Sequence, residues 1–268
     1  MGEFLLIWAT IAYAGAAILI TYNHLRGHSK PSIPGWWLVA SGWFAQFFVL
    51  AQDFLSQHSL SVNFSDSLKL SAMTMGLLYL ISWRLQRQTT RSVGLILLPL
   101  MVFSLGAALS LPSEEAKFQT LTDPILITHL VLSLLAYGLL SIAAILSLMD
   151  TFQEHALRTK RLGKLFNMLP PLEALEETLF LMVRMGFALL TLSILTGTLY
   201  SNSQNGLFFA FTHKVIFTWA TWLLFGTLLL GHHLWGWRGR KASRFILSGY
   251  LFLALAFLGV KFVGEMLR

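Results

Sequence analysis

The sequence contains no cysteine, which excludes disulfide bonds, thiol redox chemistry and iron–sulfur ligation by this chain. Charged residues are also scarce: they make up 12% of the 268 residues, about half the fraction found in a soluble domain. We find no Gly-rich phosphate loop, no His-Glu metal helix and no Ser/His/Asp set. Nothing in these motifs therefore indicates an enzyme.

Long apolar segments dominate the chain instead. Hydrophobic residues account for 56% of it, and the mean hydropathy is +0.67. A helix needs about 20 residues to cross a bilayer core of about 30 Å. Eight segments approach or exceed that length: 4–22, 36–52, 68–83, 93–111, 125–150, 178–200, 213–235 and 245–264. The sequence predicts an all-α polytopic membrane bundle of about eight helices, forming one integral domain over 1–268 with four spans in 1–123 and four in 124–268.

The distribution of Lys and Arg predicts the orientation of these helices. One set of loops carries thirteen basic residues and the opposite set five, and the bias alternates from loop to loop. Both termini are therefore expected outside, in the periplasm or cell exterior, and the chain in a bacterial inner membrane. The net charge is +7, but these cations lie in short separate loops, so we expect the lipid bilayer and not nucleic acid as partner. Only Glu3 precedes the first apolar segment, which we expect to be a retained helix and not a signal peptide.

Two histidines are predicted at the outer ends of separate helices. His129 lies one turn inside the fifth span, and His213 begins the seventh. Two imidazoles at matching depth can ligate one haem iron from its two faces. Helix N-termini and Lys214 favour an anionic group nearby, such as a haem propionate. His129 and His213 are thus the predicted metal ligands, although interface residues with no ligand are the competing interpretation.

Three more histidines and one arginine are weaker candidates for a cofactor site. His232 and His233 lie at the inner end of the seventh span, where His24 is the partner at similar depth. Their alternative role is that of a basic aromatic anchor at the membrane interface. Arg184 lies about two turns inside the sixth span. It either extends toward the inner surface or binds a propionate.

Several short motifs lie in the carboxy-terminal half of the sequence. They include Leu-Pro-Pro-Leu-Glu at 169–173, Gly-Phe-Ala-Leu-Leu-Thr at 186–191 and Gly-Trp-Arg-Gly-Arg-Lys-Ala at 236–242. This pattern resembles the cytochrome c assembly superfamily (CcsA, CcmC and HemX-like proteins), and within it the YpjD branch of inner-membrane proteins. The resemblance implies a bundle of about eight helices that binds haem and presents it at the outer face.

The same resemblance separates the ligase members of the family from this chain. The haem-handling members carry a tryptophan-rich loop before the seventh span and outer histidines as axial ligands, of which His129 matches one. The corresponding loop, 201–212, contains no tryptophan, and the family's second outer histidine has no counterpart after the last span. We therefore expect a haem carrier or sensor and not a ligase. That His213 replaces the missing ligand is our inference from its position.

Two other functions remain open. A non-enzymatic scaffold or regulator of the same fold, without haem and with another membrane protein as partner, is the main alternative. A transporter for a metal or small solute would need a polar path, for which the first four spans offer few residues beyond Gln46, Gln52 and Ser71. No carboxylate is expected deep in a span.

Overall fold

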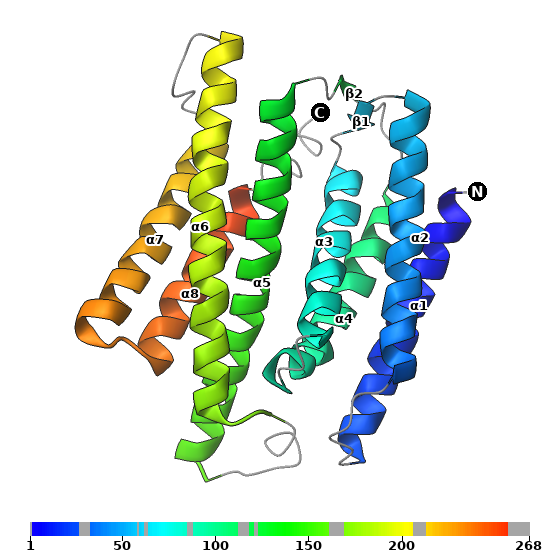
Figure 1. Cartoon of the computed structure of the whole chain (residues 1–268). Helices are drawn as coiled ribbons and strands as arrows, with labels where there is room; N and C mark the ends of the chain where they lie inside the picture. Colours follow the sequence, from blue (N-terminus) through cyan, green and yellow to red (C-terminus); the bar gives the residue numbers. More distant parts are fainter. Residues whose placement is uncertain are drawn as a thin grey trace. The chain divides into compact units, whose positions relative to one another are not determined.

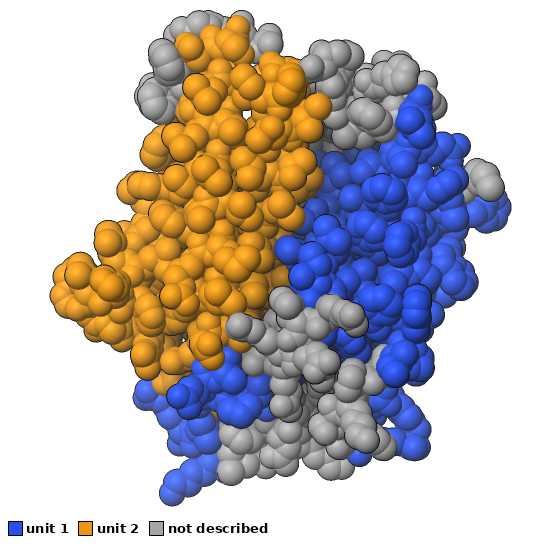
Figure 2. Space-filling view, in the orientation of Figure 1, with its two compact units in different colours: residues 1–120, 155–175 blue, residues 121–154, 176–268 orange. Residues whose placement is uncertain are grey.

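A computed structural model describes residues 2–26, 33–57, 59–61, 64–84, 88–111, 118–120, 123–160, 169–205 and 213–256. The chain divides into two compact units (Figure 2). Unit 1 comprises residues 1–120 with 155–175, and unit 2 comprises residues 121–154 with 176–268.

Unit 1 is built from the first four helices, which are α1 (Gly2–Leu25), α2 (Ile33–Gln57), α3 (Phe64–Arg84) and α4 (Gln88–Ser110). Here α1 packs against α2 and α4, and α3 packs against α2 and α4 (Figure 1). Two three-residue strands, β1 (Ser59–Ser61) and β2 (Phe118–Thr120), pair antiparallel with Leu60 opposite Gln119.

Small residues allow α1 and α2 to approach closely. Ala9, Ala12 and Ala16 are buried along one face of α1, which is the pattern of small residues that brings membrane helices together. At Gly42 of α2, an added Cβ would lie 3.0 Å from the Tyr13 ring. The Tyr13 hydroxyl in turn donates to Gln46 Oε1 at 2.6 Å. The predicted polar residue of the second span is therefore satisfied inside the unit.

Unit 2 contains most of the other four helices, which run alternately up and down (Figure 1). They are α5 (Pro124–Arg158), α6 (Leu172–Asn205), α7 (His213–Trp235) and α8 (Gly239–Ala254). The α5 helix begins where the Asp123 side chain accepts a hydrogen bond from the Ile125 N–H and Pro124 takes the first position. Pro170 and Pro171 precede α6, as expected of residues that cannot continue a helix.

Side-chain hydrogen bonds join the helices of unit 2. The Trp222 indole of α7 donates to Thr191 Oγ1 of α6 at 2.9 Å. The Ser141 hydroxyl of α5 lies 3.0 Å from the Tyr250 hydroxyl of α8. Residues 136–147 of α5 are buried without interruption, as expected of a helix that is apolar on all sides.

The described residues confirm the predicted α-helical membrane bundle, to which β1 and β2 add one short antiparallel pair. Six helices, α1, α2, α4, α5, α6 and α7, are long and apolar enough to cross a membrane. The α3 helix is more polar, because Asp66, Lys69 and several hydroxyl residues occupy its N-terminal half. Only 16 residues of α8 are described, and the predicted span 245–264 continues beyond them.

Two features of α5 go beyond the predicted span. Residues 151–158 continue the helix past the predicted span end at 150, because they contain neither Gly nor Pro to interrupt it. Asp150 is buried inside this longer helix, with 2% of its surface exposed. It accepts a hydrogen bond from the Ser243 hydroxyl at 3.0 Å. A buried carboxylate therefore lies at the predicted inner end of the fifth span.

Candidate functional site

His129 has a fixed orientation at the N-terminal end of α5. Its Nδ1 lies 2.8 Å from the backbone carbonyl oxygen of Ser193 on α6, and the Ser193 hydroxyl lies 3.3 Å from the same nitrogen. A carbonyl oxygen can only accept, so Nδ1 carries the proton and donates it. Nε2 then keeps its lone pair, and no hydrogen bond to it is found among the described residues. This is the arrangement of a histidine that ligates a metal through one nitrogen while a backbone carbonyl orients the other.

A glycine on α6 leaves the space that this imidazole occupies. At Gly197, an added Cβ would lie 2.9 Å from His129 Cε1 and 3.0 Å from Nδ1. Ser193 and Gly197 are one turn apart, and so face the same side of α6. One residue thus supplies the hydrogen-bond acceptor, and the other the space for the ring.

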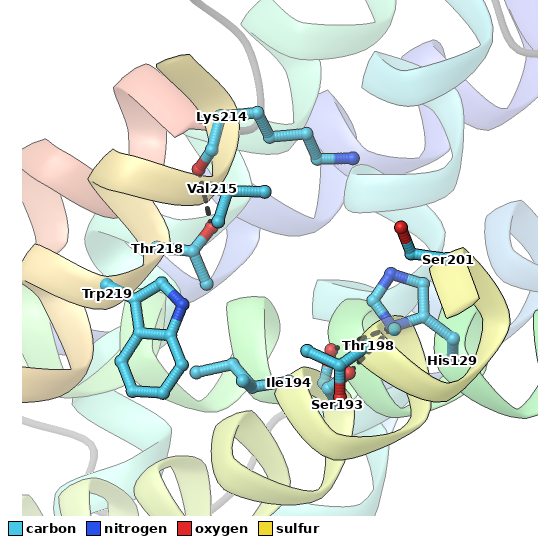
Figure 3. Close-up of a pocket in the computed structure, with 10 residues that line it drawn as sticks. His129, Ser193, Ile194, Thr198, Ser201, Lys214, Val215, Thr218 and Trp219 are labelled. Carbon is cyan, nitrogen blue, oxygen red and sulfur yellow. Dashed lines mark hydrogen bonds between the residues drawn. The ribbon is translucent and has the colours of Figure 1, made fainter. Parts of the chain in front are cut away.

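His129 lines a cavity of about 180 Å³ between α5, α6 and α7 (Figure 3). The polar lining consists of hydroxyl groups and one cation, contributed by Ser193, Thr198, Ser201, Thr218 and Lys214. Val215, Ile194 and the Trp219 ring form the apolar part. No carboxylate is among these lining residues. The cavity therefore suits a ligand that combines a flat apolar surface with an anionic group.

The size of the cavity limits what it can enclose. Cofactor and drug sites usually measure about 300–1,000 Å³, and this cavity is smaller, about 180 Å³. It can take the edge of a large planar ligand, but not the whole of it. The described residues contain no group of three or more His, Cys, Asp or Glu side chains that could hold a metal ion. Haem iron does not need such a group, because the macrocycle supplies four ligands and the protein only one or two.

The predicted partner of His129 lies partly outside the described residues. His213 is the first residue of α7, as expected, but its side chain and the preceding residues 206–212 are not described. Lys214, the next residue, lines the cavity. In Figure 3 its side chain extends over the space beside His129. The structure thus brings together two of the three predicted outer residues.

Two of the other four candidate residues, His232 and Arg184, have protein contacts of their own. His232 Nδ1 donates to the Trp237 carbonyl at 3.0 Å, and its ring stacks on Phe180 with centroids 3.6 Å apart. His233 is exposed, and the side chain of His24 lies outside the described residues. Arg184 is exposed and its Nε donates to the Phe180 carbonyl one turn back. Its side chain thus turns toward the predicted inner surface.

Sequence reasoning named only His129 and Lys214 among the lining residues of the pocket, and missed Ser193, Gly197 and Trp219 in particular. Ser193 and Gly197 form a pair of small residues at helical spacing, a signal too common in membrane helices to single them out. Trp219 lies inside the seventh span, whereas the family resemblance directs attention to tryptophan in the preceding loop.

The fold and the pocket define a polytopic helical membrane protein with an oriented histidine and a cation at one end of its bundle. The chain belongs to the cytochrome c assembly family, described as cytochrome C assembly protein, which it matches over residues 61–268. The family resemblance of the sequence is therefore confirmed.

Individual relatives agree with this assignment. The inner membrane protein YpjD of Escherichia coli strain K12 is 31% identical over 183 residues, covering 66% of this chain and 68% of the relative. An uncharacterised 28.8 kDa protein of Azospirillum brasilense is 37% identical over 139 residues, covering 52% and 51%. The cytochrome c biogenesis protein CcsA of Guillardia theta is 24% identical over 213 residues, covering 72% and 71%. No solved structure matches significantly. The chain is a multi-pass protein of the bacterial inner membrane.

Proposed function

We propose that this protein binds haem at the outer pocket of unit 2 and carries or senses it, without joining it to a cytochrome. The single observation that carries the proposal is the orientation of His129. Its Nδ1 donates to the Ser193 carbonyl, so that Nε2 remains available as an axial ligand. Family membership supports the proposal, since the relative from Guillardia theta is named a cytochrome c biogenesis protein.

The residues around His129 fit one edge of a haem. Lys214 and the hydroxyl groups of Thr198 and Ser201 suit the propionates, and Trp219 offers an aromatic face to the ring. His213 is the candidate second ligand, because it precedes Lys214 at the start of α7. When bound, the iron supplies the coordination positions and the absorption bands by which binding can be measured.

The absence of tryptophan from 201–212 supports a carrier or sensor over a ligase. The family resemblance assigns a tryptophan-rich loop to the haem-handling members at this place, and this chain lacks that composition. Arg184, His24, His232 and His233 remain candidates for a second, inner site. We rank them below the outer pocket, because the His232 ring stacks on Phe180 with centroids 3.6 Å apart and Arg184 is exposed.

Absorption spectroscopy on the full chain tests the proposal. The protein would be purified in mild detergent from haem-replete cells, and spectra recorded in the oxidised and reduced states. We expect a Soret band, with sharp α and β bands after reduction if two strong ligands hold the iron. His129→Ala and His213→Ala should each lose most of this signal at unchanged yield of folded protein. His155→Ala is the matched control, because this exposed histidine lies at the other end of α5.

Other results would change the assignment. Full retention of haem by the double variant of His129 and His213 would direct attention to His24 with His232 or His233. A featureless spectrum that added haem does not change would favour the scaffold or regulator. The small volume of the cavity is the observation that favours this second function.

A further inference from the structure

The connection between α7 and α8 has a defined conformation. Gly236 and Gly239 have φ values of +63° and +54°, which residues with a side chain rarely adopt. The Trp237 N–H donates to the Gly231 carbonyl at 3.2 Å, and the Trp237 ring covers Gly231 so closely that a Cβ there would collide with it. His232 donates to the carbonyl of Trp237. This connection therefore fixes the position at which the basic residues of α8 begin.

Carboxylates of α5 and α6 interact with the first turn of α8. Glu176 Oε1 accepts the Gly239 N–H at 3.2 Å, and Arg240 Nε lies 3.4 Å from Glu154 Oε1. Acidic groups are favourable at a helix N-terminus. Arg240 therefore has an anionic partner inside the unit.

The face of α8 that points away from its buried residues presents a row of residues beside Arg240. Lys241, Arg244, Ser248, Leu251 and Leu255 recur every three or four positions, which places them on one face of a helix. All five are exposed, and so is Arg238 just before the helix. We call these six residues the α8 stripe.

The cations of the α8 stripe have no carboxylate partner among the described residues. Lys241 Nζ lies 3.6 Å from the centroid of the Trp237 ring. Trp235, which is 67% exposed, lies shortly before Lys241 in the chain and stacks on Trp237. Basic residues next to exposed tryptophan are typical of the headgroup level of a membrane.

The order of residues along the α8 stripe matches the order of chemical groups in a phospholipid. Its cations come first, and Ser248, Leu251 and Leu255 follow as the helix continues. At about 1.5 Å per residue, Lys241 and Leu255 are about 21 Å apart along the axis, so the stripe covers both the headgroup level and part of the acyl region. Charge and polarity thus both point to a lipid with an anionic headgroup.

We propose that the α8 stripe binds an anionic phospholipid, with the phosphate held by Arg238, Lys241 and Arg244 and an acyl chain lying against Leu251 and Leu255. The loop charges place this end of α8 on the inner side, so the ligand is a lipid of the inner leaflet. The site is separate from the pocket at His129, and does not depend on haem.

Native mass spectrometry of the full-length protein in a non-ionic detergent tests this assignment. Phosphatidylglycerol and phosphatidylcholine with identical acyl chains would be titrated separately. Each cation near an anionic headgroup contributes about fivefold in affinity, so we expect the three cations together to give the wild type a preference for phosphatidylglycerol of about a hundredfold. The triple variant R238Q/K241Q/R244Q should bind both lipids equally. Arg244→Gln alone should lose about fivefold, which keeps the test valid if the triple variant folds poorly.

Two controls distinguish binding at this site from a general effect of the protein's net charge. Lys160→Gln removes an exposed cation outside α8, and should leave the preference unchanged. The charge-conserving variant R238K/R244K should retain it. Equal binding of both lipids by the wild type, or an unchanged preference in the triple variant, would overturn the proposal. Displacement of phosphatidylglycerol by inorganic phosphate at equal concentration would identify a free anion as the ligand, and would also overturn it.

Discussion

Gly197→Ala is the sharpest perturbation of the proposed haem site, because it adds one methyl group against the ligand. The new Cβ would lie 2.9 Å from His129 Cε1, about 0.5 Å closer than an ordinary carbon contact. If the ring moves away from α6 by that amount, the Nδ1–oxygen distance grows from 2.8 Å to about 3.3 Å, beyond the usual limit of about 3.2 Å. The imidazole then loses the hydrogen bond that orients it.

Three effects determine the stability of this variant. Alanine is better than glycine inside a helix by about 1 kcal/mol. Overpacking costs about 1–3 kcal/mol, and a lost hydrogen bond about 0.5–1.5 kcal/mol. Their sum predicts a decrease of about 2 kcal/mol in the free energy of unfolding, which a folded membrane protein can tolerate. Haem affinity should fall more clearly, by about 10–100-fold, which is the usual cost of disturbing a residue that orients a metal ligand.

Haem titration followed by absorbance, together with thermal unfolding in detergent, measures both quantities. Gly226→Ala is the matched control in the same unit, because its Cβ would lie 3.5 Å from the Phe187 ring, an ordinary contact. This control should bind haem like the wild type and be as stable or slightly more stable. If Gly197→Ala bound haem as tightly as Gly226→Ala, the role of His129 as ligand would be refuted.

Two further predictions concern buried hydrogen bonds that hold each unit together. Tyr13→Phe should lower the free energy of unfolding by about 1–3 kcal/mol in denaturant titrations, because Gln46 Oε1 loses the hydroxyl 2.6 Å away. The double variant that also carries Gln46→Leu should recover most of this loss. A further decrease in the double variant would contradict this account. Asp150→Ala should lower the free energy of unfolding by a similar amount, about 1–3 kcal/mol, because it leaves the buried Ser243 hydroxyl without its acceptor. An unchanged midpoint of thermal unfolding would show that this hydrogen bond contributes nothing to stability.

The sequence predicts the helices of this protein well, because a bilayer requires long apolar segments whatever their tertiary contacts. The seventh span, predicted at 213–235, coincides with α7 (His213–Trp235). Helix ends outside the apolar core are less predictable, since hydropathy does not report them. This is why α5 continues beyond the predicted end at 150 to Arg158.

The candidate site was predictable in part. His129 followed from its place near the start of an apolar helix, after Asp123 and Pro124. Its contacts with Ser193 and Gly197 did not, because they depend on how α6 is rotated about its axis. Hydropathy constrains this rotation only weakly in a membrane, where lipid and protein interior are equally apolar.

The basic residues of α8 illustrate the same limit at the other end of the unit. Counting charges places Arg238, Arg240, Lys241 and Arg244 together on the inner side, and predicts orientation alone. The structure separates one of these cations from the other three: Arg240 Nε lies 3.4 Å from Glu154 Oε1, whereas the other three residues are exposed. A paired cation contributes little to an external ligand, whereas an exposed row that continues into Leu251 and Leu255 has the charge and polarity of a lipid site. The number of cations thus determines which way the chain inserts, and their arrangement on the helix determines what it can bind there.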